Sequence, residues 1–120
     1  MKIMIVDDSQ TMRMIVMRTI RAAGYTGHSF VEAGNGKEAI KSLQGEKPDL
    51  VLMDWNMPEM NGITCLKTIR AFGYKTPVVF VTSESDQESR AQANAAGAAG
   101  LITKPFTVES FKGTLEQFLA

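Results

Sequence analysis

Five polar residues stand at the ends of short apolar runs, and their side chains are those that phosphoryl chemistry uses. Asp7 and Asp8 follow the first run, Asp54 follows the third, and Thr82 and Lys104 close the last two. Clustered carboxylates repel one another unless a cation lies between them, and Mg²⁺ prefers such oxygen ligands. With Mg²⁺ on Asp8 and Asp54, and Asp7 assisting through water, one carboxylate oxygen is left free to attack a phosphoryl group. The Lys104 ammonium would neutralise the developing charge, and the Thr82 hydroxyl would bind a phosphoryl oxygen.

The hydrophobic pattern predicts five strand–helix units that bring these residues together. Continuous apolar runs are typical of strands covered on both faces, and the segments between them have helical periodicity. The expected strands are 3–6, 28–31, 50–53, 78–81 and 101–102, and the expected helices are 12–20 with a stop at Gly24, 37–43, 63–72, 88–96, and 108–119 with Thr107 as N-cap. This order predicts an α/β fold of the flavodoxin type, a doubly wound parallel sheet of five strands with helices on both faces. Ligands of such sheets bind at the carboxyl ends of the strands, so the polar residues should meet there.

Composition indicates one neutral globular domain. The chain has 120 residues, 44% of them hydrophobic, which is enough for a single domain over residues 1–120. Thirteen basic and thirteen acidic residues cancel, which argues against a general nucleic-acid or membrane-surface binder. The lone Cys65 excludes an internal disulfide, and no apolar segment has the length of a membrane span. The start does not resemble a secretory signal peptide, so we expect a cytoplasmic protein without an effector domain.

The five polar residues, in this order and spacing and with Pro105 after the lysine, resemble the receiver domain of two-component response regulators. The resemblance spans nearly the whole chain, and the segment 54–62, Asp-Trp-Asn-Met-Pro-Glu-Met-Asn-Gly, is most similar to the single-domain chemotaxis (CheY-like) members. It implies that Asp54 is phosphorylated by a histidine kinase. It also implies that Mg²⁺ binds through Asp8, Asp54 and the backbone carbonyl of Asn56, and that the peptide before Pro105 is cis.

The resemblance also implies partners and a switch. A CheA-like histidine kinase or a phosphotransfer protein would supply the phosphoryl group. A phosphatase could remove it, and a monomeric phosphorylated chain would bind a flagellar switch protein or another output protein. Asn56 and Glu84 flank the path of the hydrolytic water in such domains and match the members whose aspartyl phosphate is short-lived. Leu101 stands where those members have an aromatic residue, so we expect Thr82 and the loop through Glu84 to carry the conformational change.

The first helix of receiver domains helps to dock the phosphodonor, and its pattern here suggests an exposed apolar surface. The periodicity places Met12, Ile15 and Val16 toward the core, and it places Met14 and Met17 on the outer side. Methionine suits adaptable contacts with a partner.

Three alternatives compete with a receiver that switches a chemotaxis partner. The chain could be a phosphate sink or a phosphorelay receiver that does not act on a motor. It could be a phosphatase with Asp54 as nucleophile, although such enzymes usually carry an acid two positions later and Asn56 cannot give a proton. It could be a flavin-binding module, although Asp7 and Asp8 would repel a phosphate after the first strand.

Overall fold

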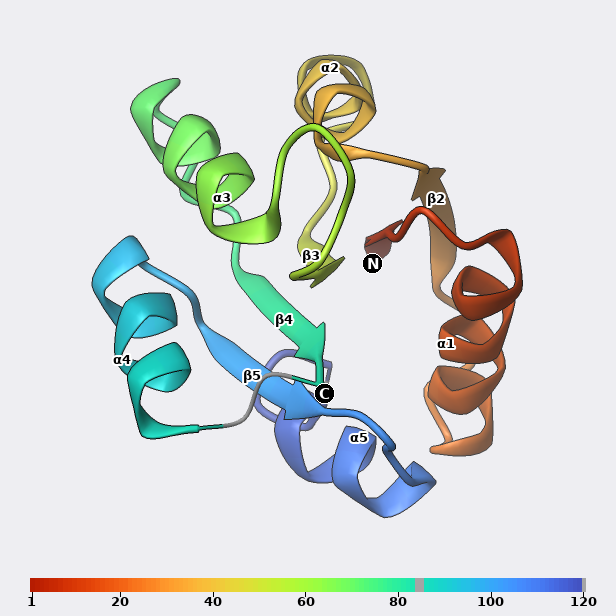
Figure 1. Ribbon diagram of the computed structural model, residues 1–120. Coiled ribbons are helices and arrows are strands. Elements are labelled where there is room, and N and C mark those ends of the chain that lie inside the picture. The colour runs from red at the N-terminus through yellow and green to blue at the C-terminus, as the bar shows by residue number, and fades with distance from the viewer. Residues whose placement is uncertain (84–85, 120) are drawn as a thin grey trace.

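The computed structural model describes residues 1–83 and 86–119, which form one central sheet with helices packed on it (Figure 1). Strands and helices alternate along the chain, as the hydrophobic pattern predicts. The elements are β1 (Lys2–Val6), α1 (Gln10–Ala22), β2 (Ser29–Ala33), α2 (Gly36–Glu46), β3 (Leu50–Asp54), α3 (Gly62–Ala71), β4 (Val78–Thr82), α4 (Gln87–Ala96), β5 (Gly100–Thr103) and α5 (Val108–Leu115).

The five strands are all parallel and lie in the order β2-β1-β3-β4-β5, which confirms the doubly wound α/β fold. Helices α1 and α5 cover one face of the sheet, and α2, α3 and α4 cover the other (Figure 1). Each face therefore has its own apolar core, and every residue of the central strand β3 and of β4 is buried. The strand order reverses direction between β1 and β3, and such a switch point is where parallel sheets bind ligands.

Each helix begins at a polar side chain that accepts a hydrogen bond from a backbone N–H of the first turn. This bond satisfies one of the donors that a helix start leaves without a partner. The predicted cap Thr107 is among them and forms a reciprocal capping box with Ser110. The N-cap residues are Ser9, Asn35, Asn61, Asp86 and Thr107. In the described part of the chain, none of the helices has the length and apolarity needed to cross a membrane.

The observed element boundaries differ from the predicted ones by a few residues, and three of these differences are informative. Strand β2 is Ser29–Ala33 rather than 28–31, because its register is set by pairing with β1 and not by its own weak alternation. Helix α2 extends over Gly36–Glu46, beyond the predicted 37–43 at both ends. Helix α5 ends at Leu115, whereas 108–119 was expected; the chain continues in turns that still bury Leu119.

The predicted facing of α1 was wrong at two residues. Ile15 was expected to face the core but is 40% exposed, and Met17 was expected to face outward but is half-buried against the core. The buried residues of the helix are Val16 and Ile20, four positions apart. This stripe turns Ile15 toward solvent, and Met14 is exposed beside it as predicted.

Candidate functional site

The turn from β1 into α1 carries the two adjacent acids. Asp7 is 5% exposed, and its backbone N–H continues the pairing with β2 by donating to the carbonyl of Ala33. The backbone N–H of Ser9 donates to Asp7 Oδ1 at 2.9 Å, while the Ser9 hydroxyl caps α1. Ser9 rather than Asp8 is therefore the cap, and the Asp8 side chain remains exposed at the edge of the sheet.

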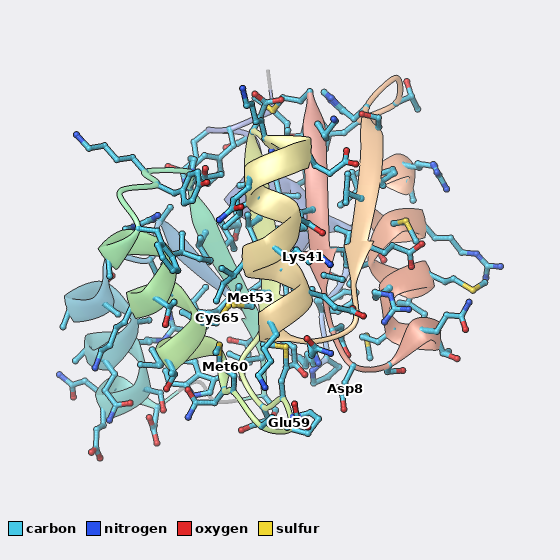
Figure 2. All side chains as sticks on the ribbon, turned by 90° about the horizontal axis from the view of Figure 1, so that it is seen from above. Asp8, Lys41, Met53, Glu59, Met60 and Cys65 are labelled. Carbon is cyan, nitrogen blue, oxygen red and sulfur yellow. The ribbon has the colours of Figure 1, made fainter. Side chains whose placement is uncertain are left out.

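Asp54 completes an acidic cluster with these two residues. It is the last residue of the central strand β3 and is 8% exposed. Oxygen atoms of Asp7, Asp8 and Asp54 all lie within 4.8 Å of one another. Figure 2 shows Asp8 at the same end of the molecule as Glu59, which belongs to the loop after β3. A set of three close carboxylates is the donor set that a hard divalent cation takes, so the cluster fits the magnesium site that the sequence suggests.

Lys104 lies beside the acidic cluster, as the sequence predicts. Its Nζ is 3.4 Å from Asp54 Oδ1 and 3.8 Å from Asp7 Oδ2. Its backbone N–H donates to the carbonyl of Thr82 at 2.7 Å, which fixes the end of β5 against the end of β4. The Lys104–Pro105 peptide is cis, as the resemblance implied. An ammonium held between two carboxylates is also placed to meet a phosphoryl group on either of them.

The electrostatics of Asp7 show how crowded the cluster is. Burial raises the pKa of the Asp7 carboxyl above its ordinary value, and the charges of Asp54 and Asp8 raise it further. The Ser9 N–H and the Lys104 ammonium lower the pKa but do not cancel the rise. Since a bound cation would favour the ionised form of each carboxylate, metal binding would relieve this repulsion.

The loop between β3 and α3 is anchored on both sides of Asn56. Trp55 and Met57 are buried, and the Trp55 ring packs against Phe80 of β4 with a centroid separation of 5.1 Å. Asn56 lies between them and is exposed. Because the side chains on both sides of Asn56 are buried, its main chain is held close to Asp54. The role of its carbonyl as a metal ligand stays a prediction.

Gly62 closes this loop because no side chain fits at its position. Its N–H donates to the carbonyl of Trp55 at 2.8 Å. A Cβ atom on Gly62 would lie 2.6 Å from Phe80 Cε1 and 2.8 Å from the carbonyl oxygen of Asp54. The start of α3 is thus in direct contact with the backbone of the residue proposed to accept the phosphoryl group.

Thr82, Leu101 and Pro105 are the remaining predicted switch residues that the structure describes. Thr82 is fully buried at the end of β4. Leu101 is on β5, half-buried against the core that α2, α3 and α4 cover. Pro105 follows the lysine and is exposed. Glu84 lies outside the described residues.

Sequence reasoning missed two residues that shape the site. Arg13 binds the backbone of Asp7, and Gly62 provides the close approach to Asp54. The glycine carried a signal, since Asn61-Gly62 directly precedes the predicted helix 63–72. Arg13 carried no local signal because it is on α1 and its partner Glu32 is on β2, 19 positions away.

Comparison with known families matches residues 3–116 to the Response regulator receiver domain. The chain is 42% identical over 119 residues to the Chemotaxis protein CheY-3 of Vibrio cholerae, covering 98% of this chain and 90% of the relative. It is 39% identical to the Chemotaxis protein CheY of Pseudomonas aeruginosa, covering 98% of this chain and 94% of the relative.

Solved structures give the same result. The chemotaxis protein CheY4 of Vibrio cholerae superposes with a TM-score of 0.86 at 35% identity over 98% of both chains. The receiver domain of the Francisella response regulator 1452 superposes with a TM-score of 0.82 at 25% identity, over 97% of this chain and 93% of that one. The chain therefore belongs to the response regulator receiver domains, which are signalling domains, and not to the phosphatases or flavin-binding modules that the sequence left open.

Proposed function

We propose that this chain is a response regulator receiver whose binding to an output protein is switched when a histidine kinase or phosphotransfer protein phosphorylates Asp54. One observation carries the proposal. The buried Asp54 carboxylate, at the end of the central strand, has two further carboxylates within 4.8 Å and the Lys104 ammonium at 3.4 Å. That is the charge arrangement that phosphoryl transfer to a carboxylate requires. A cytoplasmic location goes with it, because the kinase draws its phosphoryl group from ATP.

The acidic cluster would hold Mg²⁺. Asp8, Asp54 and the backbone carbonyl of Asn56 would be its protein ligands, with Asp7 acting through water. When bound, the ion supplies positive charge against the phosphoryl oxygens. The exposed Asp8 carboxylate leaves room for the waters that Mg²⁺ keeps.

The side chains of the site divide the remaining work. A carboxylate oxygen of Asp54 attacks phosphorus, the phosphorus–nitrogen bond to the donor histidine breaks, and the imidazole nitrogen keeps the electron pair. Lys104 contacts Asp54 Oδ1 and neutralises charge on the transferred group. The Thr82 hydroxyl then binds a phosphoryl oxygen, and this contact couples phosphorylation to the loop that follows β4. The resemblance assigns Asn56 and Glu84 to the control of the hydrolytic water, and their match to the members with a short-lived aspartyl phosphate supports a short lifetime here.

The surface beside Lys104 would receive the phosphodonor. A groove of about 470 Å³ opens there between α1 and residues 104–106, which precede α5, and Ile15 is exposed in its wall. The groove is lined by Met12, Ile15, Ser83, Lys104, Pro105 and Phe106. An exposed apolar surface that borders the acidic site fits a helix that presents a phosphohistidine. The exposure of Ile15, which the periodicity did not predict, enlarges this surface.

The output would be read on the face formed by α4, β5 and α5. Helix α4 is lightly anchored, since Ala93 is its buried residue, so it can shift when the loop after β4 moves. The relatives named as chemotaxis proteins support a chemotaxis role. A flagellar switch protein is the partner that the resemblance implies for such a role. Leu101 favours a second candidate, a phosphate sink or phosphorelay receiver, because it has no ring to swing inward.

A motility assay distinguishes the two candidates. The chemotaxis role would be favoured if deletion of the gene abolished directed motility and the wild-type chain restored it. A Leu101→Ala variant that still accepts phosphate should then fail to restore it.

The decisive experiment is phosphorylation by acetyl phosphate with Mg²⁺, followed by mass spectrometry of the intact protein. The wild-type chain should gain one phosphoryl group, and Asp54→Asn should gain none. Asp49→Asn is the matched control, because Asp49 is an exposed aspartate at the opposite end of β3, where it binds the backbone of Lys2. Phosphorylation of Asp54→Asn at the level of Asp49→Asn would refute the proposed function.

A further inference from the structure

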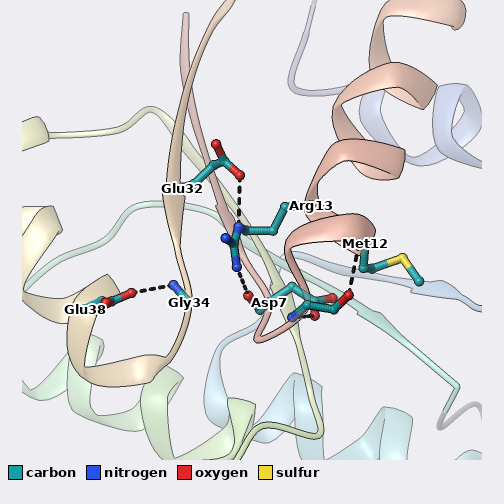
Figure 3. Close-up of polar contacts among 7 residues, drawn as sticks. Asp7, Met12, Arg13, Glu32, Gly34 and Glu38 are labelled. Carbon is teal, nitrogen blue, oxygen red and sulfur yellow. Dashed lines mark hydrogen bonds and ion pairs between the residues drawn. The ribbon is translucent and has the colours of Figure 1, made fainter.

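Arg13 connects α1, the β1–α1 turn and β2 through one side chain. Its Nη1 donates to the backbone carbonyl of Asp7 at 2.6 Å, and its Nε donates to Glu32 Oε1 at 2.9 Å (Figure 3). The Arg13 side chain is 16% exposed, while that of Glu32 is 43% exposed. A guanidinium group with both ends occupied in this way is held in one orientation.

The contact with Asp7 controls the peptide that leads to Asp8. The carbonyl of Asp7 belongs to the peptide group between the two acids, so fixing it sets the direction in which the chain enters Asp8. The Asp7 side chain is held separately by the N–H of Ser9. No hydrogen bond from the described residues holds the Asp8 carboxylate itself. The position of that carboxylate therefore depends on its backbone.

The guanidinium of Arg13 lies beside the loop that follows β2. Glu38 Oε2 accepts a hydrogen bond from the N–H of Gly34 at 2.6 Å, which closes the loop after β2 beside the guanidinium (Figure 3). A Cβ atom on Gly34 would already lie 3.7 Å from Arg13 Nη1. The charge of Arg13 is balanced by Glu32 on β2 and does not form an ion pair with the acidic cluster in the described part of the chain.

We propose that Arg13 is a positioning residue for the acidic site: by holding the Asp7 carbonyl, with Glu32 as its anchor, it places the Asp8 carboxylate for metal binding. This inference rests on the proposed function, because it assigns Asp8 to the Mg²⁺ site. The proposed role of Arg13 is to hold the backbone, not to act through its positive charge. The two roles predict opposite results when Arg13 is replaced by a neutral residue. Losing the backbone contact would weaken the binding of Mg²⁺, whereas losing only a nearby positive charge would strengthen it.

Titration of Mg²⁺ against the emission of Trp55, the only tryptophan, measures metal affinity without phosphorylation. Arg13→Met should raise the dissociation constant about tenfold, which is the usual loss when a group that orients a metal ligand is removed. Arg18→Met is the matched control, because Arg18 is an exposed arginine on the same helix. It should bind Mg²⁺ within about twofold of wild type. Unchanged or tighter binding by Arg13→Met, or an equal loss in Arg18→Met, would overturn the inference.

Two further variants test the anchor and guard against misfolding. Arg13→Lys keeps the charge but cannot span Asp7 and Glu32, so its affinity should stay closer to that of Arg13→Met than to wild type. Glu32→Gln should show a smaller loss with an unchanged melting temperature. In the metal-free protein, amide shifts of Asp8 should move in Arg13→Met and not in Arg18→Met. Wild-type affinity in Arg13→Lys, or unmoved Asp8 shifts, would refute the positioning role alone, whereas a flat wild-type titration would refute the metal site and the inference with it.

Discussion

Gly62→Ala tests the contact between the start of α3 and the backbone of the proposed phosphoacceptor. The added Cβ would lie 2.6 Å from Phe80 Cε1, 2.8 Å from the carbonyl oxygen of Asp54 and 3.0 Å from Trp55 Cα. Two of these atoms are backbone, and the third belongs to a fully buried ring, so none can move aside cheaply. The substitution must therefore displace either α3 or the chain around Asp54.

The expected size of the effect follows from two opposing contributions. Overpacking a closely packed site costs about 1–3 kcal/mol. Replacing glycine by alanine within a helix gains about 0.5–1 kcal/mol, and less at a first helical residue such as Gly62. The overpacking cost is larger, so Gly62→Ala should lower the free energy of unfolding by about 1–2 kcal/mol. In a domain of this size that corresponds to a melting temperature lower by roughly 4–8 °C.

Urea unfolding followed by far-UV circular dichroism measures this loss, and acetyl phosphate labelling measures the effect on the site. Labelling should slow by about 10- to 100-fold if the Asp54 backbone moves by a sizeable fraction of an ångström. Gly113→Ala is the matched control, because Gly113 lies inside α5 with nothing within 4 Å of its added Cβ. It should gain about 0.5–1 kcal/mol of stability and label normally.

The result that would refute this reasoning is a Gly62→Ala protein as stable as Gly113→Ala and labelled at the wild-type rate. That outcome would mean that α3 is not seated against the Asp54 backbone. A loss of stability with normal labelling would place the strain in Phe80 alone, and the proposed link between Gly62 and the phosphoacceptor would fail.

Two further predictions concern residues of the loop and the core. Glu59 has a left-handed φ of 68°, which asparagine adopts more readily, so Glu59→Asn should raise the free energy of unfolding by about 0.5–1 kcal/mol; an unchanged urea midpoint would contradict this strain. Burial raises the pKa of the Cys65 thiol from 9.0 to about 11, so the folded state holds this proton more tightly than the unfolded state. The thiol's contribution to stability is therefore fully present below pH 9 and is lost as the pH rises toward 11, by up to about 1.4 kcal/mol per pH unit. The stability difference between wild type and Cys65→Ala should shrink over that interval, and a constant difference would count against the raised pKa.

Much of the fold could be read from the sequence because it depends on local patterns. Apolar runs of four residues are enough to mark buried strands, and polar caps such as Thr107 are enough to mark helix starts. In parallel strands all carboxyl ends meet at one edge, so Asp7, Asp54 and Lys104 could be placed together before any distance was known. The weak second strand was misplaced, because its register depends on a neighbour and not on its own residues.

The phase of α1 shows where local patterns fail. The apolar spacing of this helix is satisfied by more than one choice of buried face. The sheet and α5 select Val16 and Ile20, and this choice leaves Ile15 exposed beside the acidic edge. The difference matters for function, because the exposed residue borders the groove proposed for the phosphodonor.

Residue type and the direction of parallel strands were enough to predict which residues would carry the proposed chemistry and at which edge of the sheet they lie. How those residues are held depends on contacts between elements that are far apart in the chain. Lys104 meets Asp54 across 50 positions of the chain, and Arg13 reaches Glu32 across 19. Position 62, at the start of α3, has no space for a side chain because Phe80 of β4 lies against it. Such contacts depend on how strands and helices pack, which no local spacing encodes, and they fix the ångström-scale geometry on which phosphoryl transfer depends.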